Sequence, residues 1–307
     1  MSVTKKYLSL IKFSHTIFAM PFAMIGFFLG VMHYHQQMTA IDAAGHASYY
    51  DSLGQYFAGQ WYIFVLVVLC MVFARSAAMA FNRYLDRAFD EKNPRTAIRE
   101  IPAGLLKANS VLLFTIINCV LFIACTFFIN RICFYLSPVA LAVILGYSYT
   151  KRFTPLCHLV LGLGLSLAPI GAYMAVTGRF ALLPVLFSFA VIFWVSGFDI
   201  IYSLQDEDFD KAEGLYSMPS SLGKGGALRV SQLLHVLSAA CVIAAGFYAG
   251  FGWLYWMGVA VFCGMLLYQH SIVRPHDLRR VNLAFITANG IASVVFAVFV
   301  IADLFVR

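Results

Sequence analysis

Nine long apolar segments constrain this chain more than any other feature. Each is about as long as an α-helix must be to cross roughly 30 Å of hydrocarbon. We expect them at 13–32, 61–81, 111–130, 132–150, 157–177, 182–202, 231–251, 253–271 and 284–306. The chain is 62% hydrophobic and only 11% charged, whereas a soluble domain carries about 25% charged residues. Because a helix satisfies its own backbone hydrogen bonds in lipid, the sequence predicts an all-α integral membrane protein.

Several connections between these segments are very short. A single residue separates the predicted spans 111–130 and 132–150, and another separates 231–251 and 253–271. Segments joined this closely must form tight hairpins of antiparallel helices. We therefore expect one bundle of nine transmembrane helices and a single polytopic domain over residues 1–307.

The basic residues predict how the bundle lies in the membrane. Of 21 Lys and Arg residues, 17 fall in the N-terminal segment or in loops on the same side, three fall on the other side, and Arg75 lies inside a span. Since positively charged loops stay in the cytoplasm, we expect a cytoplasmic N-terminus and an outside C-terminus, in the bacterial inner membrane. Anionic lipid headgroups account for the net charge of +7, so we expect no nucleic-acid partner.

Two acidic clusters follow predicted spans on the cytoplasmic side. The chain has 14 Asp and Glu residues, and 10 of them fall within 86–100 and 199–213. The polar residues of interest are Asn82, Asp86 and Asp90 in the first cluster, and Asp199, Tyr202, Asp206 and Asp210 in the second. Their spacing in steps of three or four residues, or sums of these, predicts that each cluster lines one face of a helix.

The clusters predict a site for a metal-bound anion. Carboxylates without His or Cys partners suit Mg²⁺, which is usually held by one or two carboxylates and by substrate phosphate oxygens. Basic residues such as Arg95, Arg99, Lys151 and Arg152 lie nearby in the sequence, and they would balance the anion. Each cluster precedes a loop with Pro and Gly, which indicates two related helical units facing each other. The alternative is that the acids are only charged helix ends at the membrane surface.

Both clusters resemble the aspartate-rich motifs of the UbiA superfamily of intramembrane prenyltransferases. Asn82, Asp86 and Asp90 match NxxxDxxxD, while Asp199, Tyr202, Asp206 and Asp210 match DxxYxxxDxxxD. The segments KNPRTAIREIPAG and GYSYTKRFTPLCHLVLG also resemble family segments. The resemblance covers essentially the whole chain and is closest to the 4-hydroxybenzoate polyprenyltransferase group. It implies a UbiA-like bundle around a central cavity.

The resemblance also implies a reaction and roles for particular residues. It implies Mg²⁺-dependent transfer of a prenyl chain from a polyprenyl diphosphate to an aromatic acid, closest to 4-hydroxybenzoate, in quinone biosynthesis beside membrane lipid. The implied metal and diphosphate ligands are Asn82, Asp86, Asp90, Asp206 and Asp210. The candidate catalytic residues are Asp86, Asp206, Asp199 and Tyr147, and the candidate substrate-binding residues are Arg75, Lys151, Asn82 and Tyr202.

Arg75 is the basic residue inside a predicted span. It precedes Asn82 by seven residues, so it lies on the same helical face and about 10 Å deeper. A charge at that depth is costly and is usually functional. Relatives that bind hydroxybenzoate have an Arg at the equivalent position, where it is implicated in recognising the acceptor. We predict that Arg75 pairs with the acceptor; the alternative is a structural ion pair with Asp199 or bonds to backbone carbonyls.

Two other functions stay open from the sequence. The segment at Ser14, His15 and Thr16 departs from the Asp-Lys-Pro expected of bacterial 4-hydroxybenzoate enzymes, so a naphthoate acceptor in menaquinone biosynthesis is an alternative. A secondary transporter would also have many spans and paired units. Transporter ion sites, however, tend to lie near the bilayer midplane in broken helices, whereas these acids cluster at the cytoplasmic ends.

Overall fold

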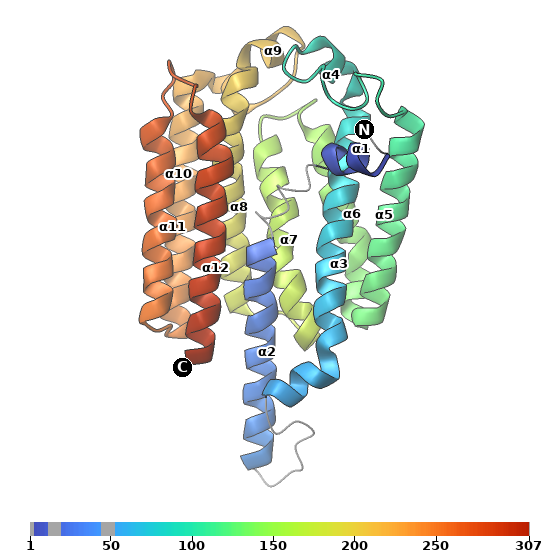
Figure 1. The fold of residues 1–307 in the computed structure, drawn as a ribbon. Coiled ribbons are helices and arrows are strands. Elements are labelled where there is room, and N and C mark those ends of the chain that lie inside the picture. The colour runs from blue at the N-terminus through green and yellow to red at the C-terminus, as the bar shows by residue number, and fades with distance from the viewer. Residues whose placement is uncertain (1–2, 12–19, 44–52, 307) are drawn as a thin grey trace.

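The structure is a computed structural model that describes residues 3–11, 20–43 and 53–306. Ser14, His15, Thr16 and the first part of the predicted span 13–32 lie outside these ranges. The described chain is helical and contains no β-strand. Its long helices form one bundle (Figure 1). They are α2 (Met20–Ala43), α3 (Leu53–Leu85), α5 (Ala108–Ile129), α6 (Arg131–Thr150), α7 (Cys157–Thr177), α8 (Leu182–Ser203), α10 (Met218–Ala249), α11 (Trp253–Ile272) and α12 (Asn289–Val306), which a π-helix, η3 (Leu283–Ala288), precedes.

The helices confirm the predicted class of membrane protein. Among the described residues, seven helices are long and apolar enough to cross a membrane. The other two long helices, α2 and α11, have 24 and 20 residues and lie in the same bundle. Both carry polar residues in their second half, at 33–37 in α2 and at Gln269 and His270 in α11. The count of nine membrane spans therefore remains a prediction.

The predicted tight hairpins are present. Only Asn130 separates α5 from α6. Its side chain accepts a hydrogen bond from the backbone N–H of Cys133 at the start of α6. It also donates to the carbonyls of Met174 and Ala175 at the end of α7. One side chain thus caps a helix and ties the hairpin to a third helix.

The largest difference in a helix boundary concerns α10. It begins at Met218 rather than near residue 231, because Ser217 and Ser220 form a capping box at its start. The backbone of Gly223, with φ 68°, kinks the first turns, and positive φ favours glycine. The polar first turns therefore extend the helix beyond its apolar part.

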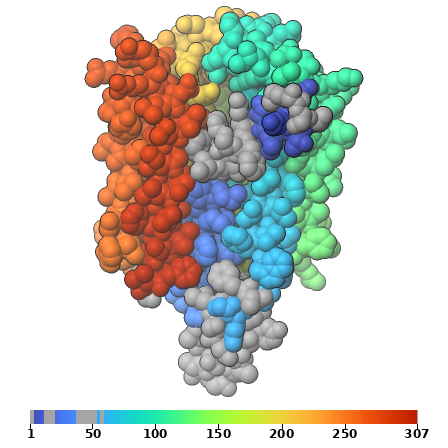
Figure 2. Space-filling view, in the orientation of Figure 1, coloured from blue at the N-terminus to red at the C-terminus, as the bar shows by residue number. Residues whose placement is uncertain are grey.

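Both acidic clusters lie at one end of the bundle. The short helix α4 (Arg87–Lys92) follows α3, and the short segments η2 (Leu204–Asp206) and α9 (Glu207–Ala212) follow α8. Figure 1 shows α4 and α9 at the same end as α1 (Val3–Leu10), with the C-terminus at the opposite end. The chain segments around α4 and α9 lie side by side over that end in Figure 2. The fold therefore agrees with the predicted grouping of both clusters on the side of the N-terminus.

Aromatic side chains fill the half of the bundle built from α2, α8, α11 and α12. Phe22, Trp194, Phe262 and Phe296 are fully buried. Their ring centroids lie 5.2–6.3 Å apart in the pairs that touch, within the range of favourable aromatic contacts. This half therefore has a close-packed interior.

Two glycines let α7 approach its neighbours closely. A Cβ atom on Gly26 of α2 would lie 1.9 Å from the carbonyl oxygen of Pro169 in α7. A Cβ atom on Gly162 of α7 would lie 2.5 Å from both the Ile192 carbonyl oxygen and Ser196 Oγ in α8. Small residues at such crossings allow the backbones of membrane helices to touch. The positions of α2, α7 and α8 thus depend on these two sites.

The Gly26 contact can be tested by adding one methyl group. Gly26→Ala should lower the unfolding free energy by about 1–3 kcal/mol, because the backbone of Pro169 cannot move aside without strain. The measurement is the midpoint of thermal unfolding in detergent. Gly146→Ala is the control, since a Cβ atom there meets nothing within 4 Å. Equal midpoints for the two variants would show that the close approach of α2 and α7 is wrong.

Candidate active site

The helix that carries each acidic cluster is interrupted at a central aspartate. Asp86 has φ −88° and ψ 4°, and Asp206 has φ −103° and ψ 3°. Each residue precedes a short helix, α4 or α9. Backbone hydrogen bonds from Asp86 to Asn82 and from Asp90 to Asp86, of 2.9 and 2.8 Å, continue through the first interruption. Each cluster therefore lies on an interrupted helix rather than on one continuous helix, and whether it lines a single face stays a prediction.

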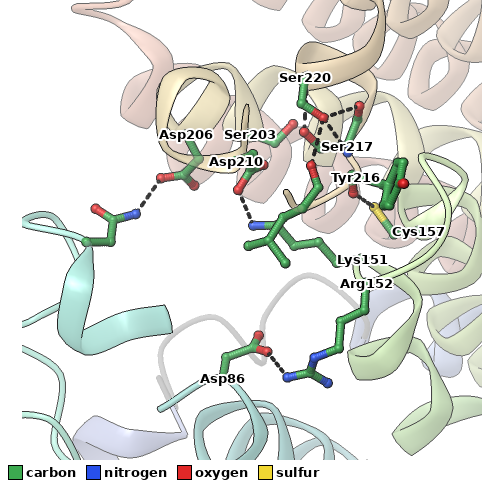
Figure 3. A network of polar contacts seen from close by, with 12 residues as sticks. Asp86, Lys151, Arg152, Cys157, Ser203, Asp206, Asp210, Tyr216, Ser217 and Ser220 are labelled. Carbon is green, nitrogen blue, oxygen red and sulfur yellow. Dashed lines mark hydrogen bonds and ion pairs between the residues drawn. The ribbon is translucent and has the colours of Figure 1, made fainter. Parts of the chain in front are cut away.

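Each aspartate of the clusters lies against a basic side chain or an imidazole. The pairs are Asp86 with Arg152 at 3.1 Å, Asp90 with Arg99 at 2.5 Å, Asp206 with Arg95 at 2.5 Å, Asp210 with Lys151 at 2.7 Å and Asp199 with His158 at 2.7 Å. Figure 3 shows that Asp86 lies across a gap from Asp206 and Asp210. Lys151 and Arg152 are neighbours in the sequence, yet they contact different clusters. The turn after α6 thus links the two clusters.

The loop after α4 closes onto the second cluster. Arg95 donates from Nε and Nη2 to the two carboxylate oxygens of Asp206, at 2.9 and 2.5 Å. Its Nη1 donates to the hydroxyl of Tyr202 at 3.1 Å, and Asn93 donates to Asp206 at 3.3 Å. Such two-pronged binding of a carboxylate fixes the geometry of both partners. Arg95 therefore holds two candidate site residues in place.

Burial and neighbouring charge change the proton affinities at the site. Burial raises the pKa of Asp86 and Asp90 adds to the effect, while Arg152 opposes it. Burial alone would lower the pKa of Lys151, but the charge of Asp210 raises it overall. Lys151 is therefore held in its charged form. The Asp86 carboxylate is poorly solvated, and a cation beside it would stabilise its charge.

The carboxylates also offer free oxygen atoms to a metal ion. In the described part of the chain, Asp90 Oδ2 and Asp210 Oδ2 are buried without a hydrogen bond, while Asp210 Oδ1 faces Lys151 Nζ at 2.7 Å. Unsatisfied buried oxygens of this kind suit a hard cation. No three acidic, His or Cys side chains among the described residues converge on one point. The buried carboxylate oxygens fit a hard cation such as Mg²⁺, which commonly takes further ligands from water or phosphate.

An apolar cavity of about 390 Å³ lies between α3, α5, α6 and α7. Arg75 and Tyr147 line it, and Tyr147 precedes Lys151 by one helical turn. Arg75 Nε is buried and has no hydrogen-bond partner among the described residues. The predicted alternative, an ion pair between Arg75 and Asp199, does not form there, since Asp199 pairs with His158. The lining of the cavity thus includes a guanidinium group.

The structure adds two residues that the motifs do not contain. Asn93 reaches Asp206, and His158 reaches Asp199. Each belongs to a segment far along the chain from its partner, so spacing alone does not reveal the contact. Within the first cluster, Asn82 donates from Nδ2 to Asp86 Oδ2 at 3.0 Å.

Sequence comparison relates this chain to prenyltransferases. Residues 52–297 match the UbiA prenyltransferase family. Over 236 residues the chain is 30% identical to a 4-hydroxybenzoate octaprenyltransferase from Paraburkholderia phymatum, covering 76% of this chain and 82% of that protein. Over 230 residues it is 30% identical to a 4-hydroxybenzoate octaprenyltransferase from Tolumonas auensis, covering 73% and 78% of the two chains.

Solved structures share the fold. A UbiA homolog from Aeropyrum pernix, in its apo form, superposes with a TM-score of 0.74 at 28% identity, over 95% of this chain and 97% of that one. A UbiA homolog from Archaeoglobus fulgidus, bound to DMAPP and Mg²⁺, superposes with a TM-score of 0.71 at 20% identity, over 98% and 100% of the two chains. At that lower identity the likeness shows the fold alone.

The contact between Arg95 and Asp206 can be measured with a double-mutant cycle. Arg95→Gln, Asp206→Asn and the double variant should give a coupling energy on the order of 1–2 kcal/mol in the unfolding free energy, since the pair is partly shielded from water. The matched control is the exposed pair of Arg279 and Asp277, which should show little or no coupling. Absence of coupling between Arg95 and Asp206 would contradict the closed position of the loop.

Proposed function

This chain belongs to the UbiA prenyltransferase family and is a membrane prenyltransferase, and we propose that it transfers a polyprenyl chain from a polyprenyl diphosphate to an aromatic acid. The acceptor that we propose is 4-hydroxybenzoate, as the names of its relatives suggest. The observation that carries the proposal is a charged site at the end of α3 and α8, next to an apolar cavity that contains a guanidinium group. Family membership sets aside the transporter alternative.

The charged end of the site suits the diphosphate. Lys151 and Arg95, now paired with Asp210 and Asp206, would turn to the diphosphate when those carboxylates bind metal. We propose that Asn82, Asp86, Asp90, Asp206 and Asp210 hold Mg²⁺, directly or through water. When bound, Mg²⁺ would neutralise the negative charge that develops on the leaving diphosphate. A UbiA homolog of the same fold has been solved with DMAPP and Mg²⁺ bound.

The cavity suits the reacting ends of the substrates. The allylic carbon–oxygen bond breaks and its electron pair leaves with the diphosphate, while a ring carbon beside the acceptor's hydroxyl forms the new carbon–carbon bond. The apolar lining keeps water from the allylic cation, and the ring of Tyr147 can stabilise that cation through its face. We propose that Asp199 lies near the reacting carbon. We also propose that Tyr202 accepts a hydrogen bond from Arg95 and so keeps Arg95 positioned for the diphosphate.

Arg75 suits the acid group of the acceptor. Its guanidinium lies inside the bundle and lines the cavity, with Nε lacking a partner in the described chain. An aromatic carboxylate would supply a negative charge beside the guanidinium and accept two parallel hydrogen bonds from it. A naphthoate with a carboxylate would make the same contact, so it is the alternative acceptor.

We further propose that residues 1–307 form one domain and that the end of the bundle with the two acidic clusters faces the cytoplasm.

The metal and diphosphate site is tested with carboxamide variants. Asp86→Asn and Asp206→Asn should each lower turnover by about 100-fold or more, because each removes a charge that acts on the leaving group. The assay measures diphosphate release and the prenylated product by mass spectrometry, with and without Mg²⁺. Asp277→Asn, in an exposed loop, is the matched control and should keep full activity. Retained turnover in both site variants would rule out these ligands.

The acceptor site is tested with Arg75→Ala. This variant should raise the KM for 4-hydroxybenzoate by about 10- to 100-fold, since it removes a hydrogen bond between charged groups. The KM for the polyprenyl diphosphate should change little. A screen of hydroxybenzoate and hydroxynaphthoate acids with wild-type protein separates the two acceptors. An unchanged acceptor KM and turnover in folded Arg75→Ala would refute the role.

A further inference from the structure

His158 lies between Asp199 and the start of α10, outside the predicted set of site residues. It is 3% exposed. Its Nδ1 lies 2.7 Å from Asp199 Oδ2, and its Nε2 lies 3.3 Å from the backbone nitrogen of Met218. A backbone N–H only donates, so Nε2 must accept and must carry no proton. The imidazole is therefore neutral, its proton is on Nδ1, and Asp199 accepts that proton as a hydrogen bond.

Contacts between helices fix this arrangement. Gly162 lets α7 and α8 touch, and Ser196 Oγ of α8 donates to the carbonyl of His158 at 3.0 Å. The capping box of Ser217 and Ser220 fixes the first turn of α10, which directs the Met218 N–H at the imidazole. Elements α7, α8 and α10 together therefore determine both the place and the tautomer of His158.

The Asp199 side chain is partly exposed, whereas the His158 side chain is buried. The side chain of Asp199 is 23% exposed and that of His158 is 4% exposed. Tyr147, which lines the apolar cavity, lies within electrostatic range of Asp199. One carboxylate oxygen is thus bound by the imidazole, and the rest of the carboxylate is partly exposed and open to a ligand.

We propose that His158 is a positioning residue that holds Asp199 as a charged proton acceptor for the aromatic substrate. The inference rests on the proposed function. After the prenyl carbon has bonded to the ring carbon and the diphosphate has left, that ring carbon still carries its hydrogen. The proton passes to the free oxygen of Asp199, and the electron pair of the broken C–H bond restores the aromatic ring. The proton then leaves Asp199 for solvent when the product departs.

Two substitutions separate this role from simple packing. His158→Leu fills the space without hydrogen bonds, and it should lower kcat by about 10- to 100-fold with the KM for polyprenyl diphosphate unchanged within about threefold. His158→Gln offers an amide N–H and a carbonyl oxygen on a side chain of similar reach, and it should restore kcat to within about threefold of wild type. His235→Leu is the control for losing a buried histidine; it should lower thermal stability while kcat stays near wild type.

A spectroscopic measurement tests the tautomer without activity. Wild-type protein carrying ¹⁵N-labelled histidine, with His158→Gln to assign the signal, should show a neutral imidazole protonated at Nδ1. Asp199→Asn should shift that signal. A charged imidazole, or one protonated at Nε2, would overturn the proposal.

The kinetic outcomes distinguish failure of the proposed function from failure of the role of His158. If wild type forms no prenylated product with any aromatic acid, the proposed function fails, and the role of His158 in transfer fails with it. If wild type transfers the prenyl group and folded His158→Leu keeps its full kcat, only the role of His158 is overturned. Equal loss in His158→Leu and His158→Gln, with both variants folded, would also overturn positioning by hydrogen bonds.

Discussion

The structure depends on the pairing of buried carboxylates with cations at the end of an apolar bundle. An unpaired charge next to hydrocarbon is costly, so each aspartate of the clusters has a partner within reach. These partners come from other segments of the chain, so the ion pairs decide how the loops fold over the helix ends. The turn at Lys151 and Arg152 has the largest effect, because adjacent residues bind opposite clusters. The helices thus place the two clusters at one end of the bundle, and the ion pairs hold the loops against them.

The same pairing explains how one site can hold ligands of opposite polarity. Arg95 and Lys151 are held beside carboxylates by charge rather than by packing, with about a third of each side chain exposed. They can therefore exchange a carboxylate for a phosphate oxygen without moving a helix. Arg75 differs, since it lies inside the bundle and lines an apolar cavity. The buried guanidinium of Arg75 needs a ligand or backbone carbonyls to stabilise its charge. The proposed acceptor end of the site, at Arg75, therefore differs from the proposed diphosphate end, where the cations are already paired with carboxylates.

Local features of the chain predicted most of the fold, and the two motifs named the candidate site residues. The apolar runs gave the helices, and the hairpins at Asn130 and before Trp253 followed from their spacing. The breaks at Asp86 and Asp206 could not be predicted, because the helical hydrogen bonds nearly continue through the first of them. The early start of α10 had a local signal in Ser217 and Ser220, but the apolar pattern begins later. The contacts of Asn93 and His158 depend on packing between distant segments, which no spacing encodes.

Asp86 and Asp206 are alike in backbone conformation but lie beside halves of the bundle that are packed differently. Asp86 and Asp206 have nearly the same φ and ψ, so a diphosphate between them would meet similar carboxylates on both sides. The half built from α2, α8, α11 and α12 is filled by buried aromatic rings such as Phe22 and Trp194. The described cavity instead lies among α3, α5, α6 and α7. Under the proposed function, a prenyl chain leaving the diphosphate on that side would pass Tyr147 and Arg75, and the close packing of the other half would leave this cavity as the place for the acceptor.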